Sequence, residues 1–264
     1  LAAAELCDHF SKILIILRDD VRLSRFSQSL RIITNNIDII EFPAWDCLPF
    51  DKNSPNQKLV GKRVRALSSL ANPNSKKTII LSTIGSVIQK IPNQDFIKNS
   101  SKSIKSGQNI SQRELINFFE NNGYMRTNTV REDSEYSLRG SILDVYPPGE
   151  KHPVRIDFFG DVIDSLRVFD PISQLSLHNI NFISLNAGNE IILTDHSIEL
   201  FRRNHRELFN EEYDKSLYSN ISQKIRTNGI EHYLSMFHES LATIFDHIGA
   251  VSYTHLTLPT TSSV

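Results

Sequence analysis

The sequence predicts an α/β protein in which a parallel sheet is joined to a smaller antiparallel α+β domain. Over the first ninety residues, short apolar segments alternate with helical patterns, which is typical of parallel strands linked by crossover helices. A meander of strand-like segments separated by turn residues follows in the middle of the chain. The last part returns to helical periodicity, so the small domain is predicted to be an insertion.

Residues 1–92 are predicted to form the first part of the α/β domain. Continuous apolar runs indicate strands buried on both faces, at Lys12 to Leu17, Ile37 to Phe42 and Lys77 to Ser82. Between the first two, a helix carries Leu23, Phe26 and Leu30 at offsets of three and four. A second helix from Asn56 places four apolar residues on one face: Val60, Val64, Leu67 and Ala71. A short helix from Gly85 to Ile91 is expected to stop at Pro92.

Residues 93–186 are predicted to form the small α+β domain. The pair Ser111 and Glu114 predicts a capping box at the start of a helix that ends at Gly123. The buried stripe of that helix is predicted to hold Leu115, Phe118 and Phe119. Three strands follow, at Arg139 to Tyr146, Val154 to Phe159 and Ile163 to Phe169. They are expected to form an antiparallel meander packed on the one helix.

Residues 187–250 are predicted to be helices that return to the α/β domain and close it. One helical face is expected to carry Ile198, Phe201, His205, Leu208 and Phe209, and a later one Tyr233, Phe237, Leu241 and Ile244. Residues 251–264 do not continue the helical pattern. We interpret them as a non-native cloning or assembly tail and exclude them from functional reasoning.

Composition limits the classes of partner. The formal net charge is −1 with a pI near 6.8, so no global positive field attracts nucleic acid or anionic lipid. A basic run on the Asn56 helix (Lys58, Lys62, Arg63 and Arg65) is interpreted as a solvent-facing stripe in preference to a DNA patch. Cys7 and Cys47 lack CxxC spacing, which favours reduced thiols. With no apolar run long enough for a membrane span, a cytoplasmic protein without a membrane partner is expected.

Motifs for chemistry are missing from the sequence. A phosphate-binding loop of the form G-x-x-x-x-G-K-[ST] does not occur, and truncation or degeneration of such a loop both stay open. The nine histidines show no metal-ligand spacing, and no nucleophile elbow is seen. We therefore expect no catalytic, cofactor-binding or metal-binding residues in this chain.

The most informative segment runs from Val154 to Phe169. Period-two alternation places Val154, Ile156 and Phe158 towards the core and Arg155, Asp157 and Phe159 on the other face. If residues 160–162 form a three-residue loop, Phe159 opposes Ile163 and Arg155 opposes Arg167. Like charges directly opposite each other cost stability. A register that pairs Arg139 with Phe159 adds a third member to this patch.

Two interpretations of the patch stay open. In one, an ordinary amphipathic hairpin satisfies its arginines with Asp157, Asp161 or Asp164. In the other, arginine and phenylalanine form an interaction hot spot, and the carboxylates of a partner relieve the arginine repulsion.

Several segments, in order along residues 1–250, resemble the transcription-repair coupling factor (Mfd) family. They are Glu41-Phe-Pro-Ala-Trp-Asp-Cys-Leu-Pro-Phe-Asp51, Arg139-Gly-Ser-Ile-Leu-Asp-Val-Tyr-Pro147, Arg155-Ile-Asp-Phe-Phe159, Ile163-Asp-Ser-Leu-Arg-Val-Phe-Asp170 and Gly229-Ile-Glu-His-Tyr233. The resemblance implies an amino-terminal, UvrB-like module: a helicase-like α/β domain with a degenerate phosphate loop and an inserted domain that docks onto UvrA. In that family UvrA binding is attributed to positions that match Arg139, Arg155 and Phe159 here; the pairing argument adds Arg167 and Phe169.

The resemblance also implies what the rest of such a protein contains. The parent would be an ATP-dependent DNA translocase that displaces stalled RNA polymerase in transcription-coupled nucleotide excision repair, using ATP and magnesium. A carboxy-terminal domain of the parent would mask the UvrA-binding face. The alternative is a fragment of a UvrB-like or helicase-like ATPase with a truncated phosphate loop. UvrB carries a long aromatic hairpin after its second strand region, and the short loop at residues 49–55 leaves no room for it, which favours the coupling factors.

Overall fold

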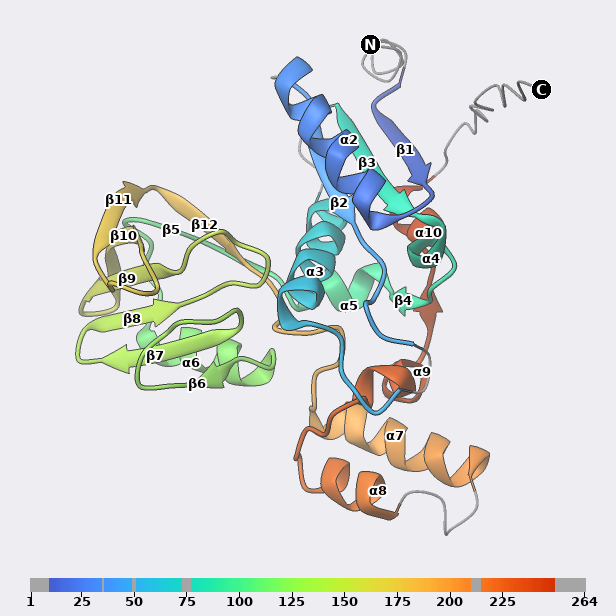
Figure 1. Cartoon of the computed structure of the whole chain (residues 1–264). Helices are drawn as coiled ribbons and strands as arrows, with labels where there is room; N and C mark the ends of the chain where they lie inside the picture. Colours follow the sequence, from blue (N-terminus) through green and yellow to red (C-terminus); the bar gives the residue numbers. More distant parts are fainter. Residues whose placement is uncertain (1–9, 35, 49–50, 73–76, 210–214, 250–264) are drawn as a thin grey trace.

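The computed structural model describes residues 10–34, 36–48, 51–72, 77–209 and 215–249. Within these ranges the chain forms a parallel α/β unit, an antiparallel sheet unit beside it and a helical unit below (Figure 1). Cys7, residues 49–50 of the loop mentioned above and the expected tail at 251–264 lie outside the described residues.

The α/β unit is built on a three-stranded parallel sheet with the order β1-β3-β2. The strands are β1 (Lys12–Leu17), β2 (Asp38–Phe42) and β3 (Thr78–Thr83), which confirms the three predicted strands. Every residue of the central strand β3 is buried, as its continuous apolar run predicted.

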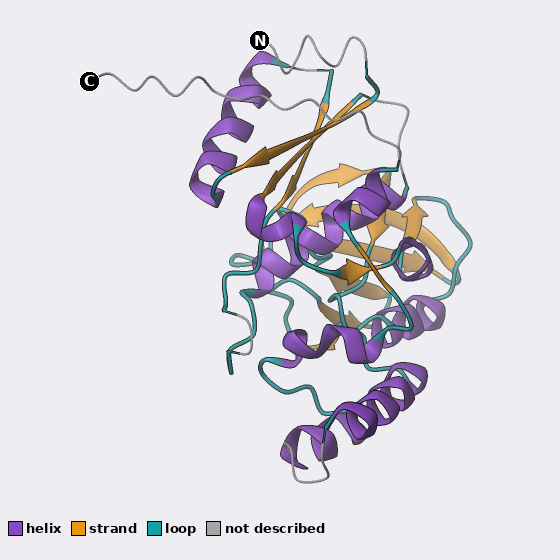
Figure 2. Ribbon diagram, turned by 90° about the vertical axis from the view of Figure 1, so that its right-hand side faces the viewer, coloured by secondary structure: helices purple, strands orange, loops and turns teal. Residues whose placement is uncertain are grey.

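Helices cover both faces of this sheet (Figure 2). Helix α2 (Asp20–Ile33) places Leu23 and Leu30 against Ile79 and Leu81. Helix α3 (Gln57–Ala71) lies on the opposite face, where Leu67 packs in one cluster with Ile80. Alternate residues of β3 therefore serve two different cores, which is why the strand has no exposed face.

The predicted helix from Gly85 to Ile91 is wrong in its second half. Helix α4 (Ile84–Val87) has one turn only, closed by a reciprocal Thr83–Ser86 capping box. The chain then forms β4 (Ile91–Pro92), which pairs with β13 (Leu241–Ala242), and continues into α5 (Gln94–Asn99). Because a short edge strand tolerates proline, Pro92 takes part in a strand and does not merely end a helix.

The antiparallel unit is a six-stranded sheet with the order β11-β10-β9-β8-β7-β6. Its strands are β6 (Met125–Arg126), β7 (Glu135–Arg139), β8 (Ile142–Val145), β9 (Val154–Phe159), β10 (Val162–Phe169) and β11 (Ser176–Ile180), all antiparallel to their neighbours except β6 with β7. Helix α6 (Gln112–Asn121) covers the inner face with Leu115 and Phe119. A two-stranded ribbon, β5 (Lys102–Lys105) paired with β12 (Phe182–Leu185), leads the chain into and out of this unit.

The predicted strand from Arg139 to Tyr146 is in fact two strands. Gly140, at a φ of +62°, turns the chain between β7 and β8, and Arg139 pairs with Ile142. Because β8 lies between β7 and β9, Arg139 does not pair with Phe159; the two backbones are separated by two strand spacings.

The hairpin of β9 and β10 differs from the predicted one by a pair of compensating changes. Its turn has two residues, Gly160 and Asp161, so Phe159 opposes Val162 and not Ile163. The register then shifts between Ile163 and Ser165, where one extra residue bulges from β10. The bulge restores the alignment that the short turn removes, and Arg155 does oppose Arg167.

Only half of the predicted capping box at Ser111 forms. The Ser111 hydroxyl accepts the Glu114 N–H at 3.2 Å, but the Glu114 carboxylate receives Lys102 Nζ at 2.5 Å instead of reaching back to the cap. The nearby ammonium is the stronger partner for a carboxylate. Gly123 has the left-handed φ of +79° that the sequence predicted at the helix end.

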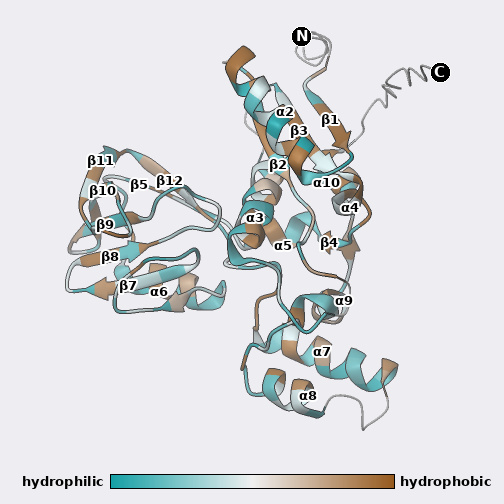
Figure 3. Cartoon of the chain, viewed as in Figure 1, coloured by the Kyte–Doolittle hydropathy of each residue, from teal (hydrophilic) through white to brown (hydrophobic). Residues whose placement is uncertain are grey.

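The helical unit has its own core. It contains α7 (Asp195–Leu208), α8 (Lys215–Ser222), the 3-10 turn η1 (Ile230–Tyr233) and α9 (Leu234–Phe237). Hydrophobic and hydrophilic residues alternate along α7 (Figure 3), with Phe201 buried against Phe237. Leu208, predicted on the same face, is 68% exposed because α7 ends there.

The return to the α/β unit is made by the last elements and not by α7 or α8. Strand β13 pairs with β4, and α10 (Ile244–Ile248) places Ile244 and Ile248 in the cluster that contains α3. Among the described residues, no helix is both long and apolar enough to cross a lipid bilayer.

Backbone contacts of α3 hold the sheet unit against the α/β unit. At Gly61 a Cβ would lie 2.6 Å from Asp133 Oδ2 and 2.7 Å from the Gly149 nitrogen, so only glycine permits this approach. Arg65 also donates from Nη1 to the Gly149 carbonyl oxygen at 2.7 Å.

A buried arginine ties α3 to the chain that leaves the sheet unit. Arg63 is 0% exposed and donates from Nε to Glu190 Oε1 at 2.6 Å. Its Nη1 donates to the Pro43 carbonyl and to Gln89 Oε1, both at 2.8 Å, and its guanidinium lies 4.5 Å from the centre of the Phe42 ring. We call Arg63, Glu190, Pro43, Gln89 and Phe42 the Arg63 cluster.

Candidate protein-docking face

The face of the six-stranded sheet opposite α6 carries the residues that strand parity singled out. In β9, Val154, Ile156 and Phe158 are buried, and the residues between them point the other way. Residues that oppose each other on neighbouring strands point to the same side of a sheet. Arg139 opposes Ile142, which opposes Asp157, so Arg139 lies on the side of Asp157. Arg167 opposes Arg155 and lies on that side as well. We define the outer face as Arg139, Asp144, Arg155, Asp157, Phe159 and Arg167.

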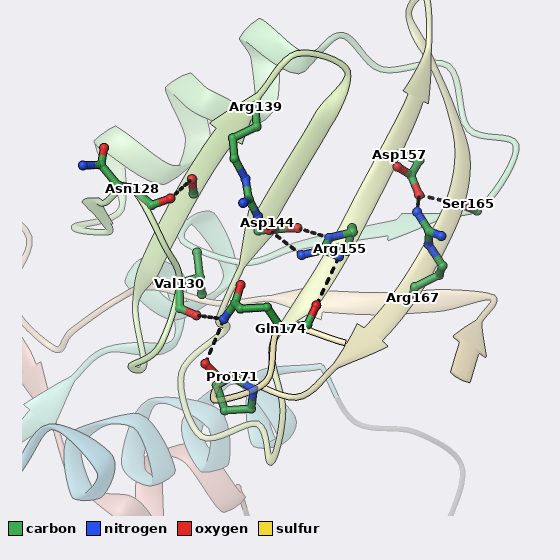
Figure 4. A network of polar contacts seen from close by, with 11 residues as sticks. Asn128, Val130, Arg139, Asp144, Arg155, Asp157, Ser165, Arg167, Pro171 and Gln174 are labelled. Carbon is green, nitrogen blue, oxygen red and sulfur yellow. Dashed lines mark hydrogen bonds and ion pairs between the residues drawn. The ribbon is translucent and has the colours of Figure 1, made fainter. Parts of the chain in front are cut away.

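Asp144 is the hub of the outer face (Figure 4). This carboxylate is 0% exposed and accepts three hydrogen bonds from two arginines. Arg155 donates from Nε to Oδ1 at 2.8 Å and from Nη2 to Oδ2 at 3.0 Å, and Arg139 donates from Nη2 to Oδ2 at 2.6 Å. The paired contacts from Arg155 fix its guanidinium in one orientation.

The Arg155 guanidinium contacts both Asp144 and the Phe169 ring. Its side chain is only 14% exposed, and its guanidinium lies 4.7 Å from the centre of the Phe169 ring. The hydrogen bonds to Asp144 raise the pKa of the Arg155 guanidinium, although partial burial opposes the shift. An arginine that is paired with a carboxylate and stacked on a ring keeps its charge and a fixed position.

Arg167, which lies directly opposite Arg155, has a different carboxylate. Its Nη2 contacts Asp157 Oδ2, which also accepts the Ser165 hydroxyl at 3.0 Å. The two opposed arginines are thus neutralised within the chain, and the expectation that a partner relieves their repulsion is wrong. Internal pairing with Asp157 is what the amphipathic-hairpin interpretation predicted, whereas the role of Asp144 was not predicted from the sequence.

Two aromatic residues of the predicted patch differ completely in exposure. Phe159 is 83% exposed, whereas Phe169 is fully buried in a small cluster with Val130 and Tyr146. Strand parity alone had placed Phe169 on the surface, but the segments carrying Val130 and Tyr146 cover that end of the face. Phe169 therefore supports Arg155 from below, and its ring is not part of the exposed surface.

Arg139 offers the donors that a partner can reach. Its side chain is 51% exposed, and among the described residues its guanidinium contacts one carboxylate, that of Asp144, through Nη2. Since a guanidinium carries five N–H groups, most of those of Arg139 face solvent. The outer face thus combines the exposed ring of Phe159 with the solvent-facing donors of Arg139, which is held in place by the buried Asp144.

Outside the outer face, the described parts of the chain bring the Cys47 thiol close to an imidazole. Cys47 Sγ lies 4.0 Å from His232 Nε2, but burial raises the pKa of the thiol, which disfavours the reactive thiolate. In those same residues, no group of three or more His, Cys, Asp or Glu side chains is placed to hold a metal ion.

Comparison with known proteins places this face in a family. The UvrB interaction domain family matches residues 103–190, which include the whole outer face. The transcription-repair-coupling factor of Haemophilus influenzae is 33% identical over 251 residues, covering 94% of this chain and 22% of that protein. The chain belongs to the transcription-repair-coupling factors. Those of Escherichia coli and Staphylococcus epidermidis are 30% and 27% identical over 92% and 94% of the chain.

The chain spans about one fifth of the length of the curated coupling factors it matches. As in the resemblance noted from the sequence, the likeness is not confined to the inserted domain, since it covers 94% of the chain. The coupling-factor relationship therefore includes the α/β unit and the helical unit as well as the sheet that carries the outer face.

Proposed function

We propose that this part of a transcription-repair coupling factor recruits UvrA through the outer face, in transcription-coupled nucleotide excision repair. The observation that carries the proposal is the exposed Phe159, 83% accessible, on the same sheet face as the half-exposed Arg139. Aromatic and arginine side chains are enriched among the residues that dominate protein–protein binding energies. The family match over residues 103–190 supports the same surface.

The structure suggests separate roles for the predicted contact residues. Phe159 would enter a pocket of UvrA, and Arg139 would donate to its carboxylates. Arg155, with few donors left free, would align Arg139 through their shared Asp144 and contribute an edge of positive charge. Arg167 lies at the flank of the face, and Phe169 acts only by supporting Arg155.

The rest of the proposal concerns the whole protein. In a coupling factor the α/β unit would be a helicase-like fold of the P-loop type whose phosphate loop has degenerated. ATP and magnesium binding, DNA translocation, contact with RNA polymerase and a domain masking the outer face would belong to other parts of the protein, in the cytoplasm. The alternative, a fragment of a UvrB-like ATPase, requires a phosphate loop outside these 264 residues, which contain no such motif.

Titration calorimetry of the chain with UvrA tests the proposal. Phe159→Ala and Arg139→Glu are each expected to weaken binding by roughly 2 kcal/mol, about thirtyfold. Two controls match these changes in size and charge: Leu208→Ala removes another exposed apolar side chain, and Arg113→Glu reverses an exposed arginine on α6, behind the sheet. If the controls weaken binding as much as the outer-face variants, or none of them does, the outer face is not the UvrA site.

A further inference from the structure

A groove separates the α/β unit from the sheet unit, away from the outer face. Its volume is about 1100 Å³. One wall is formed by β2, α3 and α5, and the other by β11, the β5–β12 ribbon and the turn at residues 149–152. Among the described residues that line it, none belongs to the outer face.

The lining of the groove is basic although the chain as a whole has a net charge of −1. Six cationic side chains and three carboxylates line it: Arg31, Lys62, Arg65, Lys98, Lys102 and Lys151 against Asp38, Glu41 and Glu150. Two of the carboxylates are already paired with groove arginines, Glu41 with Arg31 at 3.5 Å and Glu150 with Arg65 at 3.3 Å.

Three lysines of the groove have no carboxylate partner among the described residues. Lys62, Lys98 and Lys151 are exposed, and no ion pair joins any of them to another residue in the described ranges. They come from three different segments, α3, α5 and the turn that follows β8, so the folded chain brings together positive charge that is dispersed in the sequence. Such local charge attracts phosphate groups even when the net charge does not.

The groove also offers hydroxyl groups on the ribbon and one aromatic ring. Ser103 and Ser184 lie on the ribbon, whereas the hydroxyls of Ser68 and Ser101 on the α/β side are engaged with each other and with the Ile97 carbonyl oxygen. On α3, Lys62, Arg65, Ser69 and Asn72 follow each other at helical spacing over about 15 Å. Phe182, at the start of β12, is 61% exposed where it lines the groove.

We propose that this groove binds single-stranded nucleic acid. Lysine, arginine and serine side chains would contact consecutive phosphates, and a base would stack on Phe182, the combination by which single strands are held without sequence preference. A groove of this volume admits a few nucleotides of one strand, whereas a duplex would lie across its mouth. An acidic peptide would use the same cations but has no base to stack on the ring.

Fluorescence anisotropy with a labelled thymidine oligonucleotide of about 15 nucleotides tests the proposal on the 264-residue chain. At low salt, the triple variant Lys62→Glu, Lys98→Glu and Lys151→Glu is expected to bind at least about tenfold more weakly. The matched control is Lys52→Glu, Lys90→Glu and Lys215→Glu, which makes the same change in net charge at exposed lysines outside the groove. Circular dichroism verifies that both variants fold.

Phe182→Ala separates nucleic acid from other polyanions. It is expected to lower the affinity for the oligonucleotide roughly fivefold or more and to leave the affinity for poly-glutamate unchanged. Phe159→Ala, an exposed ring outside the groove, is expected to have no effect on either ligand. The proposal is overturned if the chain does not bind the oligonucleotide, if the control triple variant loses as much affinity as the groove variant, or if poly-glutamate binds more tightly than the oligonucleotide.

Discussion

Two arginine–carboxylate clusters in this chain, the Arg63 cluster and the one around Asp144, differ in what surrounds them. In the Arg63 cluster both charged side chains are closed off from solvent, with exposures of 0% for Arg63 and 1% for Glu190. On the outer face the carboxylate of Asp144 is equally buried, but the exposure of its two arginines rises from 14% at Arg155 to 51% at Arg139.

The difference indicates two uses of the same chemistry. The Arg63 guanidinium donates to groups from three separate segments of the chain, so its hydrogen bonds are used up in holding the α/β unit to the segment after β12. Asp144 instead accepts hydrogen bonds from two arginines, one on each strand beside its own, and one of these arginines is exposed to solvent. The first arrangement stabilises a junction, and the second orients a surface.

The largest effect on stability is expected at the Arg63 cluster. Arg63→Leu leaves the Glu190 carboxylate buried without a charged partner, although the Trp45 indole N–H still donates to it at 3.3 Å, and should lower the free energy of unfolding by about 3–5 kcal/mol. Urea denaturation measures this loss. Arg65→Leu, two residues along the same helix but with a 48% exposed side chain, should cost less than about 1 kcal/mol.

The double variant Arg63→Met, Glu190→Leu sharpens the same comparison. Removing both charges should restore a large part of the stability that Arg63→Leu loses, since an apolar pair needs no compensation for desolvation. If Arg63→Leu and Arg65→Leu instead cost the same, the enclosure of the Arg63 cluster has no energetic consequence.

A smaller loss of stability and a large loss of binding are expected at Asp144. Asp144→Asn keeps the size of the side chain but removes the negative charge that both arginines share, at a cost of about 2 kcal/mol in the free energy of unfolding. Binding of UvrA should weaken as well, because Arg139 and Arg155 lose their alignment. Asp164→Asn, an exposed aspartate on β10, should change neither quantity. Unaltered UvrA binding by a folded Asp144→Asn variant would show that Asp144 does not orient the docking face.

The smallest expected effect is a pH dependence at the Arg63 cluster. His238 Nε2 lies 2.9 Å from the Glu190 carbonyl oxygen, and burial lowers the pKa of His238 from its ordinary 6.5. A base with a lowered pKa binds its proton less readily in the folded state, so its contribution is complete above pH 6.5 and is lost as the pH falls below that value. The free energies of unfolding measured above and below this pH should differ less in His238→Gln than in the unchanged chain. His196→Gln, at an exposed histidine, should leave that difference unchanged.

Local patterns predicted the elements and the sidedness of the docking sheet. The apolar runs gave the three parallel strands, and the alternation in Val154 to Phe159 put Arg155 and Phe159 on one face because a strand has a period of two whatever its partners. Arg139 was assigned to the same face through a pairing with Phe159 that does not form; it reaches that face through Ile142 and Asp157 instead. Their role in binding UvrA stays a prediction.

What local patterns missed depends on contacts between distant residues. Asp144 was overlooked because its place beside Arg155 requires that residues 139–146 be split by a turn at Gly140, which the sequence argument read as one strand. Phe169 has the parity of a surface residue, and only the packing of Val130 and Tyr146 buries it. The basic groove likewise arises from segments that are far apart in the sequence, so no single segment predicts it.

The ribbon of β5 and β12 has a consequence for how the coupling factors can be rearranged. Since Lys102 pairs with Leu185 and Lys105 with Phe182, the two ends of the inserted unit leave the α/β unit side by side. A segment whose ends are adjacent can be cut out and joined to a foreign scaffold without stretching either chain. The six-stranded sheet can therefore be moved as one unit, and a hybrid protein that carries residues 102–185 on an unrelated host would take the proposed UvrA-binding face with it.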